Sequence, residues 1–207
     1  SEGTPAYSTA IELKLWPLPA KKIMGICHFP TFYQAMDAAQ HLVTLDPVAV
    51  ELVDDTMIEL ARSIPIFQPT VEEAVRGNPA ALLLVEFAEE DMAENERRLR
   101  QLHEMMGDLG FGWDKGAAWR GGVVDAIDPG MQGRIAEWRK SGLNIMMSEK
   151  SEAKPVSFLE DCAVELKDLA EYTDRLTSIF DRNGVKGTWY AHASVGCLHV
   201  RPVLNMK

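Results

Sequence analysis

Residues 80–87, with the sequence AALLLVEF, limit the possible folds more than any other stretch of the chain. Asn78-Pro79 marks a turn in front of them. Behind them, residues 89–109 are highly charged but repeat their apolar residues at helical spacing, and Gly110 is a typical helix stop. The pattern predicts a central strand of a sheet followed by a long amphipathic helix.

The other segments alternate between strand and helix patterns. We predict strands over residues 11–15, 21–29, 48–53, 155–164, 185–192 and 197–204. We predict helices over residues 32–45, 133–140 and 168–183, and a short helix from Asp54 or Asp55 to Arg62. The Gly-rich stretch 112–130 gives no clear pattern. Because several strands are joined by short turns, the order favours an α+β fold, with an antiparallel or mixed sheet and helices packed on one face, over a doubly wound parallel sheet.

Composition and simple motifs argue against several classes of function. A formal net charge of −10 offers no basic surface for nucleic acid. No apolar run reaches the ~18–20 residues of a membrane span, and no signal peptide or Gly-rich phosphate motif is recognisable. Three widely spaced cysteines fit a reducing compartment, so we expect a cytoplasmic location. Because the chain begins at Ser1 without Met, we expect a piece of a longer protein, with a processed mature chain as the alternative.

Two histidines near the C-terminus carry the clearest chemical signal, in residues 190–200, YAHASVGCLHV. A two-residue turn at Val195-Gly196 would set His192 opposite His199 on one face of a hairpin. Directly paired Cβ atoms lie about 4.5–5.5 Å apart, so both imidazoles would reach one divalent metal. Two imidazoles are half of a site, and Cys197 is a candidate third ligand. The alternative is a pair of partly exposed histidines that bind no metal.

Four motifs follow one another in a recognisable order: SEGT at residues 1–4, KLWPLP at 14–19, EWRK at 137–140 and AHASVGCLHVR at 191–201. They resemble the SEGTLG motif, the strand and proline exit, the LWxxR segment and the GHxGDGNLHxN signature of FAD-linked oxidases of the vanillyl-alcohol oxidase type. That group includes D-lactate, glycolate and D-2-hydroxyglutarate dehydrogenases. The segment AHASVGCLHVRP is most similar to a branch in which the FAD domains are fused to an iron–sulfur module.

The resemblance implies a domain assignment and an activity. Residues 1–10 would end a FAD-binding domain, with Ser1, Glu2, Gly3 and Thr4 at the cofactor, and residues 11–207 would form a ferredoxin-like cap domain. The parent protein would oxidise a 2-hydroxyacid and pass the hydride to FAD, in the cytoplasm or at the membrane surface. Its FAD-binding domains would be the partners of this fragment, which alone would be inactive, and oligomerisation is open.

The resemblance also implies roles for single residues. His192 and His199 would bind zinc or another divalent metal. Arg139 would pair with a substrate carboxylate, although a helix-surface ion pair with Glu137 or a neighbour is the alternative.

Departures from the family pattern leave the substrate open. Arg201 stands where the signature has Asn, and would bind a second carboxylate. Val195 and Cys197 replace Asp and Asn of the signature. The family's third metal ligand, a Glu, and its catalytic His would lie beyond Lys207, so we expect this piece to hold zinc loosely. The rival interpretation is a stand-alone small-ligand-binding or dimerisation module.

Overall fold

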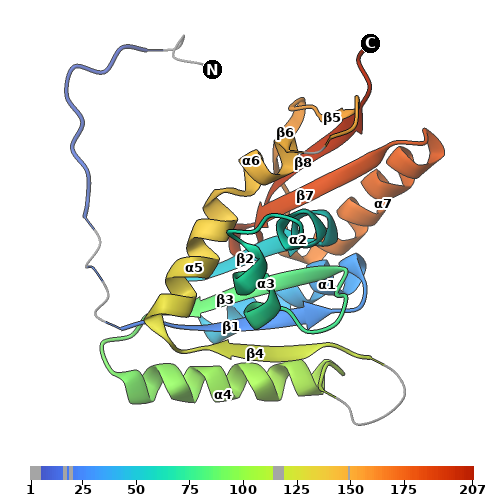
Figure 1. Cartoon of the computed structure of the whole chain (residues 1–207). Coiled ribbons are helices and arrows are strands. Elements are labelled where there is room, and N and C mark those ends of the chain that lie inside the picture. The colour runs from blue at the N-terminus through green and yellow to red at the C-terminus, as the bar shows by residue number, and fades with distance from the viewer. Residues whose placement is uncertain (1–5, 16–17, 19–20, 114–118, 149) are drawn as a thin grey trace.

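The computed structural model describes residues 6–15, 18, 21–113, 119–148 and 150–207. Its centre is an eight-stranded sheet in the order β4-β1-β3-β2-β7-β8-β5, with β6 also paired to β8 (Figure 1). Every strand pair is antiparallel. The strands are β1 Ile23–Phe29, β2 Ala49–Asp54, β3 Ala81–Phe87, β4 Gly122–Ala126, β5 Lys154–Pro155, β6 Leu159–Ala163, β7 Lys186–His192 and β8 Cys197–Leu204.

Within the described ranges, seven α-helices lie between these strands in the sequence. They are α1 Phe32–Leu42, α2 Asp55–Arg62, α3 Gln68–Ala74, α4 Met92–Asp108, α5 Pro129–Lys140, α6 Gly142–Met147 and α7 Leu169–Arg182. Three short 3-10 turns add η1 Val43–Leu45, η2 Leu166–Asp168 and η3 Ala193–Val195. None of the helices in the described ranges is long and apolar enough to cross a membrane.

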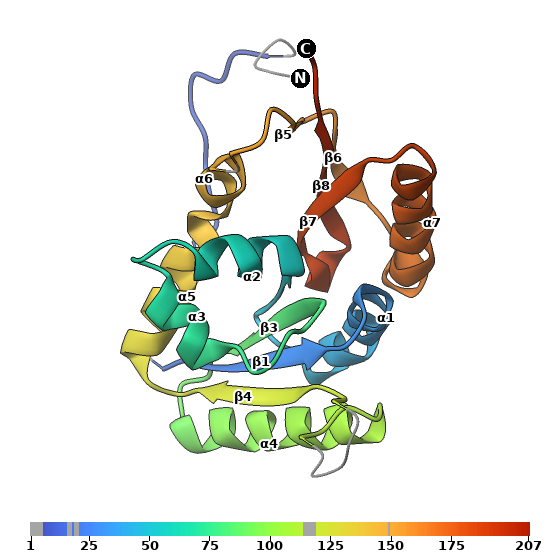
Figure 2. The same ribbon diagram turned by 45° about the vertical axis from the view of Figure 1, so that its right-hand side comes forward.

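The helices cover both faces of the sheet, because neighbouring strand residues are apolar on opposite sides. Leu83 of β3 belongs to a buried cluster with α1, α4 and α7, in which Leu102 is fully buried. Leu84 belongs to a second cluster with α2, α3, α5 and α6, built around Trp138. Figure 2 shows these two groups of helices apart from each other. The expected α+β class and antiparallel sheet are confirmed, but the helices, expected on one face, pack on two.

Acidic side chains begin several helices by accepting backbone N–H bonds. Asp54 does this for α2, where its Oδ1 accepts from the Met57 N–H at 2.9 Å. Its Oδ2 accepts from the Trp189 N–H at 2.8 Å, so one buried carboxylate also ties α2 to β7. Burial raises the pKa of Asp54 to about 7, against the two backbone hydrogen bonds, which lower it.

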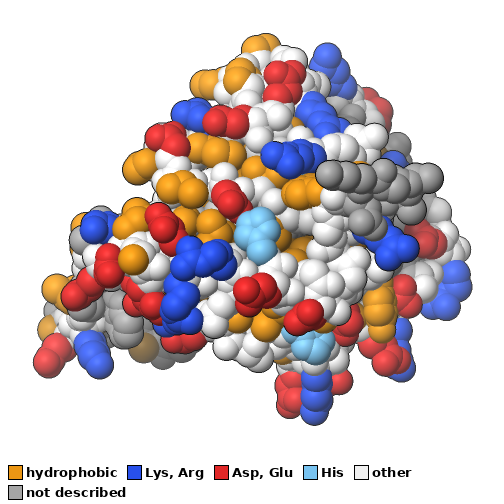
Figure 3. Space-filling view, turned by 90° about the horizontal axis from the view of Figure 1, so that it is seen from below, with side chains coloured by type: hydrophobic (Ala, Val, Ile, Leu, Met, Phe, Trp, Pro, Cys, Tyr) orange, Lys and Arg blue, Asp and Glu red, His pale blue; other side chains and the backbone are white. Residues whose placement is uncertain are grey.

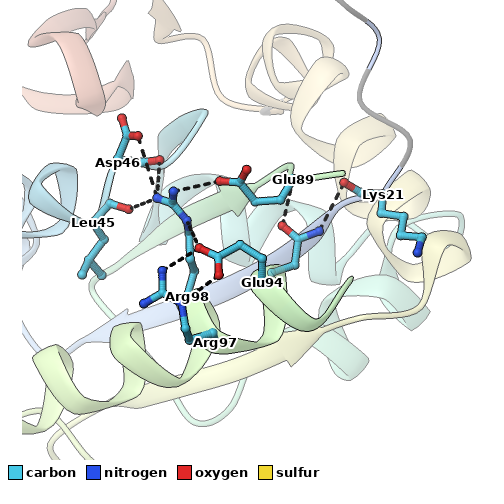
Figure 4. Close-up of polar contacts among 8 residues, drawn as sticks. Lys21, Leu45, Asp46, Glu89, Glu94, Arg97 and Arg98 are labelled. Carbon is cyan, nitrogen blue, oxygen red and sulfur yellow. Dashed lines mark hydrogen bonds and ion pairs between the residues drawn. The ribbon is translucent and has the colours of Figure 1, made fainter. Parts of the chain in front are cut away.

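Arg98 anchors α4 to the rest of the domain (Figure 4). Its Nη1 donates to the Leu45 carbonyl at 2.7 Å, and its Nη2 forms an ion pair with Glu89 at 2.9 Å. Its Nε contacts Glu94 at 3.3 Å. On the face that contains α4, acidic and basic side chains lie side by side without a basic patch (Figure 3).

The structure corrects the sequence expectations in several places. Residues 11–15 form no strand, and Ile11, Leu13 and Leu15 are 72%, 73% and 84% exposed, because an alternating segment becomes a strand only where a partner strand pairs with it. The unassigned stretch 112–130 contains β4, and the predicted strand 155–164 is divided into β5 and β6. Helices α3 and α6 were not predicted.

Candidate functional site

The hairpin of β7 and β8 carries both candidate histidines, but its turn differs from the predicted one. The connection has four residues, the 3-10 turn η3 followed by Gly196 in the left-handed region at φ 65°. The register therefore shifts by two, so that His192 pairs with Cys197 and His199 pairs with Tyr190. The prediction of His192 opposite His199 is wrong. A shift of two keeps every side chain on its face, however, so both histidines still lie on the same side of the sheet.

Glu51 of β2 holds the ring of His192. The two residues are partners across the β2–β7 ladder, and the His192 Nδ1 lies 3.0 Å from each carboxylate oxygen of Glu51. The guanidinium of Arg139, at the end of α5, forms an ion pair with the same carboxylate. The three side chains lie in a row, in which Glu51 is only 20% exposed and His192 is 47% exposed.

The ring of His199 is held more deeply, at 15% exposure. Tyr190 stacks on it with ring centres 4.5 Å apart, and its Nδ1 lies 2.9 Å from Oδ1 of Asp161 on β6. The ring of His192 approaches it edge-on, with centres 5.4 Å apart and an angle of 85° between the planes. The Nδ1 atom of each imidazole thus lies within hydrogen-bond distance of a carboxylate, and the two rings are in edge-to-face contact.

Cys197 extends this cluster. One ligand atom from each of Asp161, Cys197 and His199 lies within 4.8 Å of the other two. Burial raises the pKa of the Cys197 thiol, and the nearby Asp161, Cys162 and Glu51 raise it further. Cys27, Cys162 and Cys197 are free thiols.

The two candidate arginines lie on different elements, Arg139 at the end of α5 and Arg201 on β8. Arg139 does not pair with Glu137 as the alternative interpretation proposed, but with Glu51, and its Nε is buried without a hydrogen-bond partner among the described residues. With Lys140, Tyr190 and His192 it lines a cavity of about 200 Å³, together with Met57 and Gly142. Arg201 follows His199 by two positions in β8 and therefore shares its face.

Sequence reasoning missed Glu51, Asp161 and Tyr190. Glu51 gave a signal, because it is a carboxylate inside the otherwise apolar strand AVELVD, between buried Val50 and Leu52. Nothing in the sequence indicated that Asp161 would reach His199. Residues 1–4, the candidate cofactor contacts, lie outside the described residues.

Known proteins resemble this chain in sequence and in fold. The family "FAD linked oxidases, C-terminal domain" matches residues 18–207. A D-2-hydroxyglutarate dehydrogenase of Pantoea ananatis is 30% identical over 215 residues, and one of Escherichia coli K12 is 30% identical over 210 residues. Both alignments cover 100% of this chain and 20% of the relative, so the chain spans about a fifth of the length of these proteins.

Two solved structures share the fold. An alkyldihydroxyacetonephosphate synthase superposes with a TM-score of 0.55 over 91% of this chain and 37% of its own, at 12% identity. The 4-ethylphenol oxidase of Gulosibacter chungangensis gives a TM-score of 0.56 over 92% of this chain and 40% of its own, at 9% identity. At these identities the likeness concerns the arrangement of strands and helices alone.

Proposed function

Because the chain belongs to the family of FAD-linked oxidase C-terminal domains, we propose that it covers the substrate in a FAD-dependent dehydrogenase of 2-hydroxyacids. The observation that carries the proposal is the meeting of two carboxylate-held imidazoles beside a cavity with cationic walls. The D-2-hydroxyglutarate dehydrogenases among its relatives support a small hydroxyacid with more than one carboxylate as substrate.

The two imidazoles fit a shared divalent ion. A carboxylate on Nδ1 fixes the tautomer in which Nδ1 carries the proton and Nε2 is the ligand atom. Two rings on one tetrahedral ion, with nitrogen–metal bonds of about 2.0–2.1 Å, have their centres about 5 Å apart. The centres of His192 and His199 are 5.4 Å apart. Zinc or another divalent metal at these residues would polarise the substrate 2-hydroxyl and lower its pKa.

The remaining residues would bind and orient the acid. A guanidinium suits a carboxylate because its donors are planar and paired. Arg139 would attract a substrate carboxylate into the cavity that it lines with Lys140, and Arg201 would bind a second carboxylate. Through Glu51, Arg139 would also keep His192 in place. A small acid held in this way has its hydroxyl beside the imidazoles.

The chemistry itself needs parts outside this chain. Residues 1–10 would close a FAD-binding domain and residues 11–207 would form the cap, so that this chain alone has no hydride acceptor and no activity. Relatives about five times as long leave room for the FAD lobes and for an iron–sulfur module that would take the electrons onward. We place the complete protein in the cytoplasm or on the membrane surface.

The test uses the complete flavoprotein with His192→Ala and His199→Ala. Both variants should lose metal, measured by atomic emission, together with the rate of FAD reduction by D-2-hydroxyglutarate. His41→Ala, on the exposed side of α1, is the control and should keep both properties. Arg139→Lys should raise KM for the acid, because the planar fork is lost while the charge remains.

Full metal content and an unchanged rate of FAD reduction in both histidine variants would contradict the proposal. A complete protein without FAD would favour the alternative, a binding or dimerisation module without catalysis.

A further inference from the structure

We infer that Met57 of α2 sets the chain length of the acid that this domain accepts, because its side chain closes the cavity beside His192 toward a second, larger cavity. The inference rests on the proposed function, in which a short hydroxyacid enters the cavity beside His192. It goes beyond that function by assigning a residue that selects among hydroxyacids.

The two cavities follow one another along β7. The smaller, of about 200 Å³, has Tyr190 and His192 in its wall. The larger, of about 500 Å³, is lined by Gly187 and Thr188, which lie nearer the start of the same strand. Helices α2 and α6 contact each other and contribute residues to both cavities (Figure 2). The side chains between the two cavities therefore determine how far the smaller one extends.

Contacts that α6 makes with α2 and with β7 separate the cavities. The end of the Met57 side chain lies against Gly142, the first residue of α6, since a Cβ added to Gly142 would be 2.9 Å from the Met57 Cε. The Thr188 hydroxyl lies 2.9 Å from the sulfur of Met146, further along the same helix. Met57 lines the smaller cavity and Met146 the larger. The boundary on the side of the acid is therefore the Met57 side chain.

The backbone of Met57 is held in place, whereas its side chain can adapt. The Met57 N–H donates to the buried carboxylate of Asp54 at 2.9 Å, which fixes the first turn of α2. A Met side chain is unbranched and has three rotatable bonds, so its end follows the space available. Gly142 provides that space, because a larger residue there would displace the Met57 methyl group. The length of the cavity thus depends on the pair Met57 and Gly142.

The smaller cavity suits a short acid. At about 200 Å³ it lies below the range of about 300–1,000 Å³ that is typical of ligand pockets. An acid with its hydroxyl beside His192 and a carboxylate toward Arg139 comes closer to Met57 with each added methylene. One methylene more or less changes kcat/KM by about 10–200-fold in a fitted apolar site. We therefore expect D-2-hydroxyglutarate to be accepted and its next longer homologue, D-2-hydroxyadipate, to be rejected.

The experiment measures kcat/KM for FAD reduction in the complete flavoprotein with D-malate, D-2-hydroxyglutarate and D-2-hydroxyadipate, each one methylene longer than the last. Met57→Ala should raise the ratio of D-2-hydroxyadipate to D-2-hydroxyglutarate about tenfold or more, because the boundary is removed. Gly142→Ala should shift selectivity the other way, toward D-malate, because its Cβ pushes the Met57 methyl group into the cavity. In the double variant the effect of Gly142→Ala should vanish, since no methyl group remains to be displaced.

Met36→Ala and Gly133→Ala are matched controls. Met36 is a fully buried methionine on a helix, but it belongs to the cluster on the other face of the sheet. Gly133 is a helical glycine with no atom within 4 Å of an added Cβ. Both variants should keep the wild-type ratios.

A binding measurement reads the same selectivity without turnover. Isothermal titration with glutarate and adipate, which lack the hydroxyl that is oxidised, should show the same change in the ratio of Kd values. If Met57→Ala fails to fold, Gly142→Ala decides the question, because it displaces only the end of a flexible side chain.

Unchanged ratios in Met57→Ala and Gly142→Ala, with FAD still reduced by D-2-hydroxyglutarate, would overturn the inference and leave the proposed function standing. An equal change in Met36→Ala would overturn it too, because a general loosening of the fold would then explain the result. A complete protein whose FAD is reduced by none of the three acids would contradict the proposed function itself, and the inference would fall with it.

Discussion

Gly196 between the two histidine strands should be among the least replaceable residues of the chain, and Gly196→Ala tests this directly. At φ 65° an alanine costs about 1–2 kcal/mol relative to its preferred conformations. The new Cβ would also lie 1.9 Å from the carbonyl oxygen of Val164. That oxygen would have to withdraw by about 1.5 Å to reach the 3.4 Å of ordinary contact.

Such a movement has a further cost. The Val164 N–H donates to the Gly196 carbonyl at 2.9 Å, and losing a hydrogen bond of this kind costs about 0.5–1.5 kcal/mol. With the displaced packing of β6, we expect Gly196→Ala to lower the free energy of unfolding by about 3–4 kcal/mol. Gly184→Ala is a matched control, since Gly184 has φ 64° but no atom within 4 Å of its added Cβ. It should lose only the backbone contribution, about 1–2 kcal/mol.

The assay is urea unfolding followed by tryptophan fluorescence. With slopes of about 1–3 kcal/mol per molar urea, the two variants should differ in midpoint by on the order of 1 M, with equal slopes. If Gly196→Ala is no less stable than Gly184→Ala, the close approach of β6 to the turn does not matter, and the reasoning from geometry is refuted.

Three other outcomes follow from buried groups. Because burial raises the pKa of Asp54 to about 7 from 3.8, the folded chain holds this proton more tightly, so its stabilising contribution is complete below pH 3.8 and declines as pH rises to about 7. The difference in unfolding free energy between the wild type and Asp54→Asn should fall by about 1.4 kcal/mol per pH unit between pH 5 and 7, measured with urea; a constant difference would argue against it. Burial also raises the pKa of the Cys27 thiol, so Cys27 should react with a thiol reagent only on unfolding, as peptide mapping would reveal. The Nε1 of Trp138 is buried without a partner among the described residues, so Trp138→Phe should cost less than about 1.5 kcal/mol and Trp138→Ala about 3–5, again by urea unfolding.

Much of the fold could be predicted because its elements carry local signals. The apolar run of β3 and the helical spacing of α4 and α7 each determine one element without reference to the others. Prediction failed where structure depends on distant partners. Residues 11–15 alternate correctly, but no strand among the described residues pairs with them. The Gly121-Gly122 pair at the start of the short strand β4 gives no strand signal, and the strand is formed by pairing with β1.

The candidate site, too, could be predicted only in part. That His192 and His199 share a face follows from the two-residue period of a strand, which any even shift of register preserves. The register itself depends on the length of the loop, and a four-residue loop cannot be distinguished from a two-residue turn by the position of Gly196 alone. Glu51 and Asp161 come from strands that are not adjacent in sequence to the hairpin, so their contacts with the histidines were beyond sequence reasoning.

The pairing of β2 with β7 brings together Glu51 and His192, which are 141 positions apart in the sequence. Closing a loop of this length is entropically costly, and such nonlocal pairing slows folding. The β7–β8 hairpin is local, so during refolding we expect it to form early with His192 detached from its carboxylate. During synthesis on a ribosome, Glu51 emerges long before His192, whose imidazole it contacts in the folded chain. The contact between Glu51 and His192 should therefore form late in folding, and time-resolved hydrogen exchange at β2 would register its completion.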